Sequence, residues 1–336
     1  MYSEGAHEAN EIKKRPLMLK KGKLKRRIVV KNWTMVIFVA VTFLNLSQIE
    51  GLAAAARTET SLFLSTGYRA DNLDFNIAGD ISECCPNVLS ELTWNDLKIY
   101  QVKTGGKVIV NKIIYLQGSL GYGWIIDGEN QDSDFLGNNR TIEFSRSNNS
   151  ADNGNVLDVS FGVGYPFRFG SGQLGITPLV GYSHHEQDLR ITGGFQTIPP
   201  FGPFPGLDSA YETQWNGPWV GLDLLFKSAK KLTLFGDIEY HWADYEAEAD
   251  WNLRTDFAHP KSFEHIADGT GIVISVGGSF AITNRLSMNI DLAFQRWSTD
   301  PGIDKTFFAD GSTATTRLNE VNWDSREIML GVMFYF

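Results

Sequence analysis

Apolar and polar residues alternate along much of the chain. From Val108 to Trp124 most even positions are large and apolar, whereas most odd positions are small or polar, and the segments 232–242 and 286–295 repeat the pattern. Because successive side chains of a strand point to opposite faces, the alternation predicts strands with one apolar and one polar face. No apolar run long enough for a membrane-spanning helix follows residue 60, so a bundle of such helices is not expected.

Candidate turns and loops divide these strands. Four connections are short (104–106, 169–172, 228–230 and 283–285), and five are long and polar or rich in Gly and Pro (70–88, 128–153, 192–212, 249–265 and 298–320). Short and long connections alternate, so ten strands result and both chain ends lie on the short-turn side. This is the plan of bacterial outer-membrane barrels. We therefore predict an all-β fold, a closed antiparallel transmembrane β-barrel of about ten strands in the cell outer membrane, with both termini periplasmic.

Alternation by itself fits a soluble sandwich as well as a membrane barrel, and the aromatic residues favour the barrel. The last strand alternates up to the terminal Phe336. Trp94, Trp124, Trp242 and Trp297 lie near predicted strand ends, where aromatic girdles form at membrane interfaces. Such a sheet must close, because an open edge in hydrocarbon would leave backbone N–H and C=O groups unpaired.

The polar face of a membrane barrel points inward, and the apolar face meets lipid. On the strand that begins at Leu232, the residues predicted to face lipid are Ile238, Tyr240 and Trp242. The acidic and histidine residues predicted to face inward are Asp158, Asp223, Asp237, Glu239, His241 and Asp291. These side chains line a pore or form a plugged polar interior; a ten-stranded barrel is narrow enough for the second.

The first 56 residues have the features of an export signal. A basic region (12–32) precedes an apolar run (35–46), which is followed by small residues at 53–56. We predict a signal peptide over residues 1–56, with cleavage near Ala55 or Ala56, and an outer-membrane barrel over residues 57–336; an uncleaved anchor is the alternative. Since the basic region is unusually long, Met18 is a second candidate for the true start.

Charge and cysteine content argue against other classes of protein. The net charge of −9 disfavours nucleic-acid binding, which normally needs a basic surface. The two cysteines, Cys84 and Cys85, are adjacent, whereas a metal site needs more ligands at wider spacing, so neither a metal nor a cofactor is predicted. In an exported protein these cysteines form either a vicinal disulfide or two free loop thiols.

Several short motifs resemble the omptin family of outer-membrane endopeptidases. They are Ser90–Trp94, Gly181–Tyr182 followed by Gly193–Gly194, and the acidic pair Asp132 and Asp134 followed by Phe135. The resemblance extends over nearly the whole mature chain. It implies a ten-stranded barrel in which two aspartates of one external loop face an Asp-x-His pair of another. In that mechanism the histidine takes a proton from a water molecule held between the two pairs.

The second pair departs from the omptin pattern. Asp250 occupies the aspartate position, but Asn252 stands where the histidine is expected. Asparagine has no basic nitrogen, and general acid–base groups contribute ~10²–10⁴-fold to rate, so little or no omptin-type proteolysis is expected. His259, paired with Asp256, is the alternative base, and His265 is a poorer one. The candidate catalytic residues are Asp132, Asp134, Asp250 and His259.

Two classes of function follow from this sequence. The first is an omptin-like outer-membrane protein whose acidic external cleft resembles the endopeptidase site but lacks its histidine. The alternative is a porin-like or adhesin-type barrel without enzymatic activity. Expected partners are outer-membrane lipids, including lipopolysaccharide, and basic peptides or host proteins at the external loops, because an acidic rim attracts positive charge.

Overall fold

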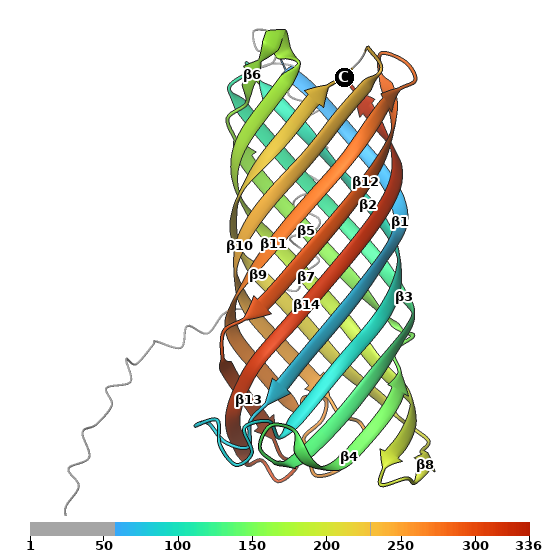
Figure 1. The fold of residues 1–336 in the computed structure, drawn as a ribbon, viewed down its shortest axis with the longest axis vertical. Coiled ribbons are helices and arrows are strands. Elements are labelled where there is room, and N and C mark those ends of the chain that lie inside the picture. Colours follow the sequence, from blue (N-terminus) through green and yellow to red (C-terminus); the bar gives the residue numbers. More distant parts are fainter. Residues whose placement is uncertain (1–57, 229) are drawn as a thin grey trace, which may run out of the picture. The chain divides into compact units, whose positions relative to one another are not determined.

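Residues 58–228 and 230–336, which a computed structural model describes, form one antiparallel sheet closed into a barrel (Figure 1). The predicted signal peptide, residues 1–56 with Met18 as the second candidate start, lies outside these residues. The strands are β1 (Thr58–Ile77), β2 (Ser90–Val110), β3 (Ile114–Gly137), β4 (Thr141–Ser150), β5 (Gly154–Gly164), β6 (Phe167–Phe169), β7 (Leu174–Ile198), β8 (Gly202–Pro203), β9 (Asp208–Lys227), β10 (Leu232–Asp250), β11 (Phe263–Ala281), β12 (Leu286–Thr299), β13 (Gly302–Phe307) and β14 (Thr313–Tyr335).

The ring has ten positions, which confirms the predicted strand number. β4 and β5 both pair with β3 and β7, so they are two parts of one position. β12 and β13 likewise both lie between β11 and β14. The short β6 and β8 extend the edges of β7, and β1 pairs with β14 to close the ring.

Both described chain ends lie at the end of the barrel that carries the short turns. The C-terminus lies at the same end of the barrel as β6 (Figure 1), and Thr58 pairs with Val110, which immediately precedes the turn between β2 and β3. The opposite end carries the longer extensions, β4, β8 and β13. Among the described residues, no helix is long and apolar enough to cross a membrane.

The orientation of β10 agrees with the prediction from alternation. Ile238, Tyr240 and Trp242 are 39–48% exposed on the outer face, whereas His241 is 1% exposed. His241 bonds across the interior to the Ser183 hydroxyl of β7, at 3.0 Å, although β9 separates the two strands. The other acidic residues predicted to face inward also bond to interior partners; these residues are Asp158, Asp223, Asp237, Glu239 and Asp291.

One predicted turn was wrong. Residues 104–106 lie inside β2, and the chain turns instead at 111–113, where Asn111 and Lys112 have positive φ values of 53° and 62°. Gly105 is needed for close packing: a Cβ there would lie 2.3 Å from the Gly118 carbonyl oxygen. The other three short connections are confirmed, at 170–173, 228–231 and 282–285.

The long connections are shorter than predicted, because polar strands extend the barrel wall. The segment 128–153 is mostly strand, since β3 runs to Gly137 and β4 pairs back along it from Thr141. Asp132 and Asp134 therefore lie on β3 and not in a loop, and Asp250 is the last residue of β10. Outside the apolar band both faces of a strand can be polar, so a polar stretch of sequence there does not indicate a loop.

Seven aromatic residues fill the interior toward the long-hairpin end, and we call them the aromatic plug. Each is at most 1% exposed; they are Phe75, Trp94, Tyr211, Trp215, Tyr245, Trp297 and Trp323. They come from six strands around the ring, and Trp94 stacks on Tyr211 and Trp297 on Trp323, with ring centroids 5.2 and 5.5 Å apart.

The predicted aromatic girdle was therefore half wrong. Trp124 and Trp242 are 46% and 48% exposed on the outer face, as a girdle requires. Trp94 and Trp297 belong to the plug. Position along a strand does not decide which face a side chain takes; the register does.

Candidate functional site

The acidic pair of β3 faces the barrel interior. Asp132 lies opposite Leu92 of β2, which is 3% exposed, and Asp134 lies opposite Ser90. Residues directly opposite in an antiparallel pair share a face of the sheet. A bulge at Ile125–Asp127 sets this phase: before it the odd positions of β3 point inward, and after it the even positions do. Both carboxylates lie beyond the exposed Trp124, outside the apolar band.

The loop between β10 and β11, residues 251–262, lies against this pair. The Trp251 indole N–H donates to Asp132, and Asp134 accepts from the Ser90 and Ser145 side chains. Burial, together with the charge of Asp134, raises the pKa of Asp132, while Arg254 and Trp251 oppose the shift. Burial also raises the pKa of Asp134, against Ser90, Arg254 and Ser145. Both carboxyls have raised pKa values and both are near the charge of Arg254, whereas only Asp132 accepts from the Trp251 indole.

Asp250 and His259 form a second pair. The His259 Nδ1 lies 2.6 Å from the Asp250 carboxylate, and its Nε2 lies 3.3 Å from the Arg254 carbonyl oxygen. Both neighbours are acceptors, an arrangement that favours a proton on each ring nitrogen. The hydrogen bond to Asp250 raises the pKa of His259 accordingly. A charged imidazolium has no lone pair with which to accept a proton from water.

The two pairs lie on opposite faces of the barrel wall. On β10 the inward positions are odd, as the buried Tyr245, Ala247 and Ala249 show, so Asp250 follows the outward phase. The next residue, Trp251, bonds inward to Asp132. The structure thus joins Asp132 to Asp134 and Asp250 to His259, and it connects the pairs through Trp251 and Arg254. A water shared by Asp132, Asp134 and Asp250 stays a prediction.

Two details of the predicted site differ in the structure. His259 pairs with Asp250 and not with Asp256, because Asp256 accepts two hydrogen bonds from Arg254, at 2.8 and 2.9 Å. Asn252 holds the neighbouring segment: its oxygen accepts from Asp208 N and the Ser209 hydroxyl, and its amide donates to the Gly206 carbonyl. The residue at the expected histidine position thus fastens one loop to another.

Sequence reasoning missed a buried chain of polar groups inside the plug. His265 is 1% exposed, and its Nε2 lies 3.2 Å from Asp304 while its Nδ1 lies 2.8 Å from the Tyr211 hydroxyl. Tyr211 in turn bonds to the Tyr245 hydroxyl at 2.7 Å. Asp304 belongs to β13, which lies within the segment 298–320 predicted to be a loop. No signal in the sequence indicated that this segment pairs with β11.

Comparison with known proteins places the chain among outer-membrane proteins. A model of the family described as "Pom: Protochlamydia outer membrane protein" matches residues 63–336. The chain belongs to this family. It is an outer-membrane protein with an omptin-like barrel. No curated protein matches it.

One solved structure shows the same fold. The outer membrane protease OmpT from Escherichia coli is 12% identical with a TM-score of 0.69, and the match covers 83% of this chain and 97% of that one. The translocator domain of the autotransporter NalP from Neisseria meningitidis is 10% identical with a TM-score of 0.36, over 90% of this chain and 98% of that one. At these identities the OmpT match shows the fold, and the NalP match is too distant to support an argument.

Proposed function

We propose that this member of the Pom family is a closed, surface-displayed outer-membrane barrel that does not cleave peptides by the omptin route. The observation that carries the proposal is the aromatic plug. A water-filled passage would leave accessible surface on the side chains that line it, whereas all seven plug residues are at most 1% exposed. The barrel then acts through its long-hairpin end as a binding or structural element of the envelope.

The candidate site supports a non-proteolytic barrel. An omptin-like mechanism needs a neutral imidazole beside a water molecule that faces the acidic pair. Here both ring nitrogens of His259 face acceptors, its partner Asp250 lies on the outward face of the wall, and Asn252 is bonded to the segment 206–209. Asp132 and Asp134 meet Trp251 and Arg254 instead of a histidine.

In this proposal both termini are periplasmic and the long hairpins face outward, in the usual orientation of outer-membrane barrels. Outer-membrane lipids, including lipopolysaccharide, surround the apolar band. The acidic outer rim favours basic peptides or host proteins as partners, because surface charge attracts opposite charge over about 10 Å at moderate salt.

Refolded protein tested against a library of basic peptides decides the enzymatic part. We expect no cleavage above a blank, and unchanged results for His259→Ala. Cleavage that is abolished by Asp134→Ala would overturn the proposal, whether or not His259→Ala retains it. Binding of basic peptides without cleavage, weakened by added salt, is the expected positive result.

A second candidate, a narrow pore for small solutes, is favoured by the polar interior between the plug and the short turns. Lys103 pairs with Glu327 and Lys107 with Asp223, and both lysine side chains are 31% exposed although they point inward. This part of the interior therefore has space for water beside the lysine side chains. Steady conductance of the wild-type barrel in a planar bilayer would favour the pore over the closed barrel.

A further inference from the structure

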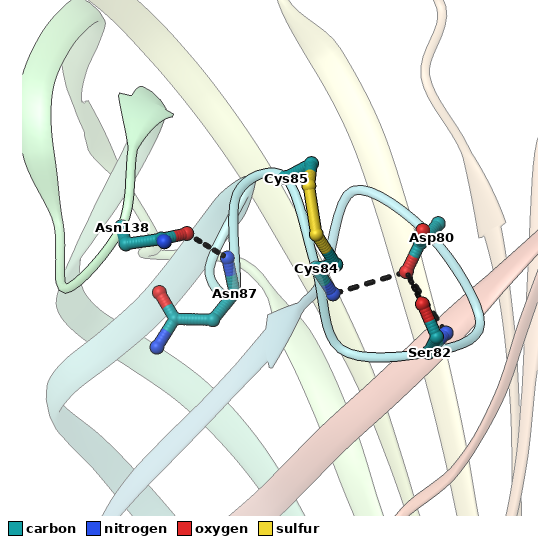
Figure 2. Close-up of a disulfide and its surroundings, with 6 residues drawn as sticks. All are labelled: Asp80, Ser82, Cys84, Cys85, Asn87 and Asn138. Atoms are coloured by element: carbon teal, nitrogen blue, oxygen red, sulfur yellow. Dashed lines mark hydrogen bonds between the residues drawn. A yellow bond between two sulfur atoms is a disulfide. The ribbon is translucent and has the colours of Figure 1, made fainter.

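The loop between β1 and β2, residues 78–89, carries a disulfide between the adjacent cysteines Cys84 and Cys85 (Figure 2). A disulfide stabilises a fold mainly by closing a loop of the unfolded chain, and the effect grows with loop length. A bond between neighbouring residues closes the shortest possible loop. Its contribution to folding is therefore the smallest that a disulfide can make, and its presence at the rim calls for another role.

The loop is anchored without help from the sulfur–sulfur bond. Gly79 N donates to the Pro86 carbonyl at 2.8 Å, and Glu83 forms an ion pair of 3.0 Å with Arg317 of β14. Asn87 accepts from and donates to the tip of the β3–β4 hairpin, through Asn138 and Asn139. Opening the disulfide therefore leaves both ends of the loop attached to the barrel.

The two sulfurs differ in their surroundings. Cys85 is exposed and Cys84 is half-buried. The Asp80 carboxylate accepts hydrogen bonds from the Cys84 N–H at 3.0 Å and from Ser82, so its negative charge lies beside the backbone of Cys84 (Figure 2). Because Cys85 is the more exposed of the two, its sulfur is the one that an incoming thiolate reaches first.

We propose that Cys84–Cys85 is a reversible thiol-exchange site on the rim of the barrel, at which an external thiolate attacks Cys85 Sγ. The new bond joins the external sulfur to Cys85 Sγ. The bond between the two Sγ atoms breaks, and its electron pair leaves on Cys84 Sγ, which takes a proton from water. Deprotonated again, Cys84 attacks Cys85 Sγ and expels the external thiol. This site does not depend on the proposed function of the barrel.

The reverse step is favoured by the same geometry. Cys84 stays next to Cys85 in the chain, so its effective concentration at the mixed disulfide is high. The carboxylate of Asp80 raises the basicity of a thiolate at Cys84, which slows its departure in the forward step and strengthens its return attack, so the equilibrium favours the closed disulfide. Exchange at this site is therefore self-restoring when the external thiol is removed.

Reduced glutathione tests the proposal on the refolded full chain. After acid quenching, fragmentation mass spectrometry should find one glutathione, on Cys85, and removal of glutathione should restore the disulfide. The double variant Cys84→Ser, Cys85→Ser should form no adduct and should keep its fold, because the hydrogen bond to Asp80 comes from the backbone N–H of residue 84. Asp80→Asn, which keeps an acceptor but removes the charge, should make Cys84 a better leaving group and so raise the fraction of chain that carries the adduct on Cys85.

The outcomes are distinct. Disulfide-linked oligomers that form only after glutathione has opened the bond, and that excess glutathione dissolves, would support exchange, because the released Cys84 thiolate of one copy then attacks Cys85 of another. Absence of an adduct under conditions that open an exposed disulfide of a control protein would overturn the proposal. So would loss of the barrel's heat-dependent gel mobility on reduction, since the bond would then be structural.

Discussion

The two acceptors around the His259 ring define its charge. Asp250 lies 2.6 Å from Nδ1, and this bond raises the pKa of the imidazole. Because the folded pKa is raised, the stabilisation from the pair is fully present below the ordinary pKa of about 6.5 and is lost as the pH rises through the folded value. We expect Asp250→Asn to move the NMR titration midpoint of His259 down toward 6.5. Asp256→Asn is the control and should leave it unchanged, because Asp256 pairs with Arg254.

Asn252 offers a second test at the residue scale. Its side chain makes three hydrogen bonds to the segment 206–209. Asn252→His would restore the omptin pattern in sequence, but it should yield no peptide cleavage, because Asp250, which would have to orient the new imidazole, already bonds to His259. Loss of these bonds should instead speed proteolytic nicking near residue 206 relative to wild type. Cleavage of basic peptides by this variant would show that the position is catalytically competent.

Strand β10 shows how the membrane fixes one face of an element. Ile238 is 45% exposed on the apolar outer face. Ile238→Arg should cost ~2–4 kcal/mol of unfolding free energy in lipid if it lies near the bilayer midplane, and less near the interface. The matched control is Gln214→Arg on β9, which lies beyond Trp242 in the outward phase and should be nearly neutral. Equal effects of the two variants in urea titrations of vesicle-embedded protein would contradict the assigned membrane position.

Strand β2 depends on a glycine that packs against its neighbour. A Cβ at Gly105 would lie 2.3 Å from the Gly118 carbonyl oxygen, whereas a Cβ at Gly278 would meet its nearest atom at 3.7 Å. We expect Gly105→Ala to destabilise the barrel by ~1–3 kcal/mol, as overpacked sites do. Gly278→Ala should be tolerated. A comparison of their unfolding midpoints in one detergent measures the difference directly.

At this scale the sequence predicted the ring but not its extensions. Alternation identifies β10 and β12 because lipid requires an apolar outer face, and the ten positions follow from counting turns. Outside the apolar band that requirement ends, so the β3–β4 hairpin and β13 were interpreted as loops. Gly105 and Gly106 were interpreted as a turn because a sequence does not distinguish a glycine needed for bending from one needed for close approach. The sequence identified the acidic pair Asp132 and Asp134. It did not predict which face of the wall Asp250 lies on, because β10 extends to this residue, which was expected in a loop.

At the scale of the whole molecule, the interior has two parts of different character. Toward the short turns it is polar, with space for water around Lys103 and Lys107. Next to the plug, Arg69 joins Asp71 and Asp158 through hydrogen bonds of 2.6–2.7 Å, and its guanidinium lies 5.3 Å from the Trp323 ring. A buried network of this kind is stable only when every charge is paired, so it also fixes the position of the plug.

The aromatic plug is expected to block the passage of ions through the barrel. Trp297 and Trp323 stack from β12 and β14, and Trp215 of β9 lies 5.7 Å from Trp297, so these rings cross the interior. The wild-type barrel should show almost no steady conductance in a planar bilayer, and Trp297→Ala with Trp323→Ala should open a measurable one. Trp124→Ala removes a ring of the same size from the outer face and should change nothing. Where the double variant fails to refold, as judged by heat-dependent gel mobility, Trp297→Leu should give a smaller opening with a smaller loss of stability. Wild-type conductance equal to that of a folded variant would mean that the rings do not close the barrel, and the pore would become the better account of this protein.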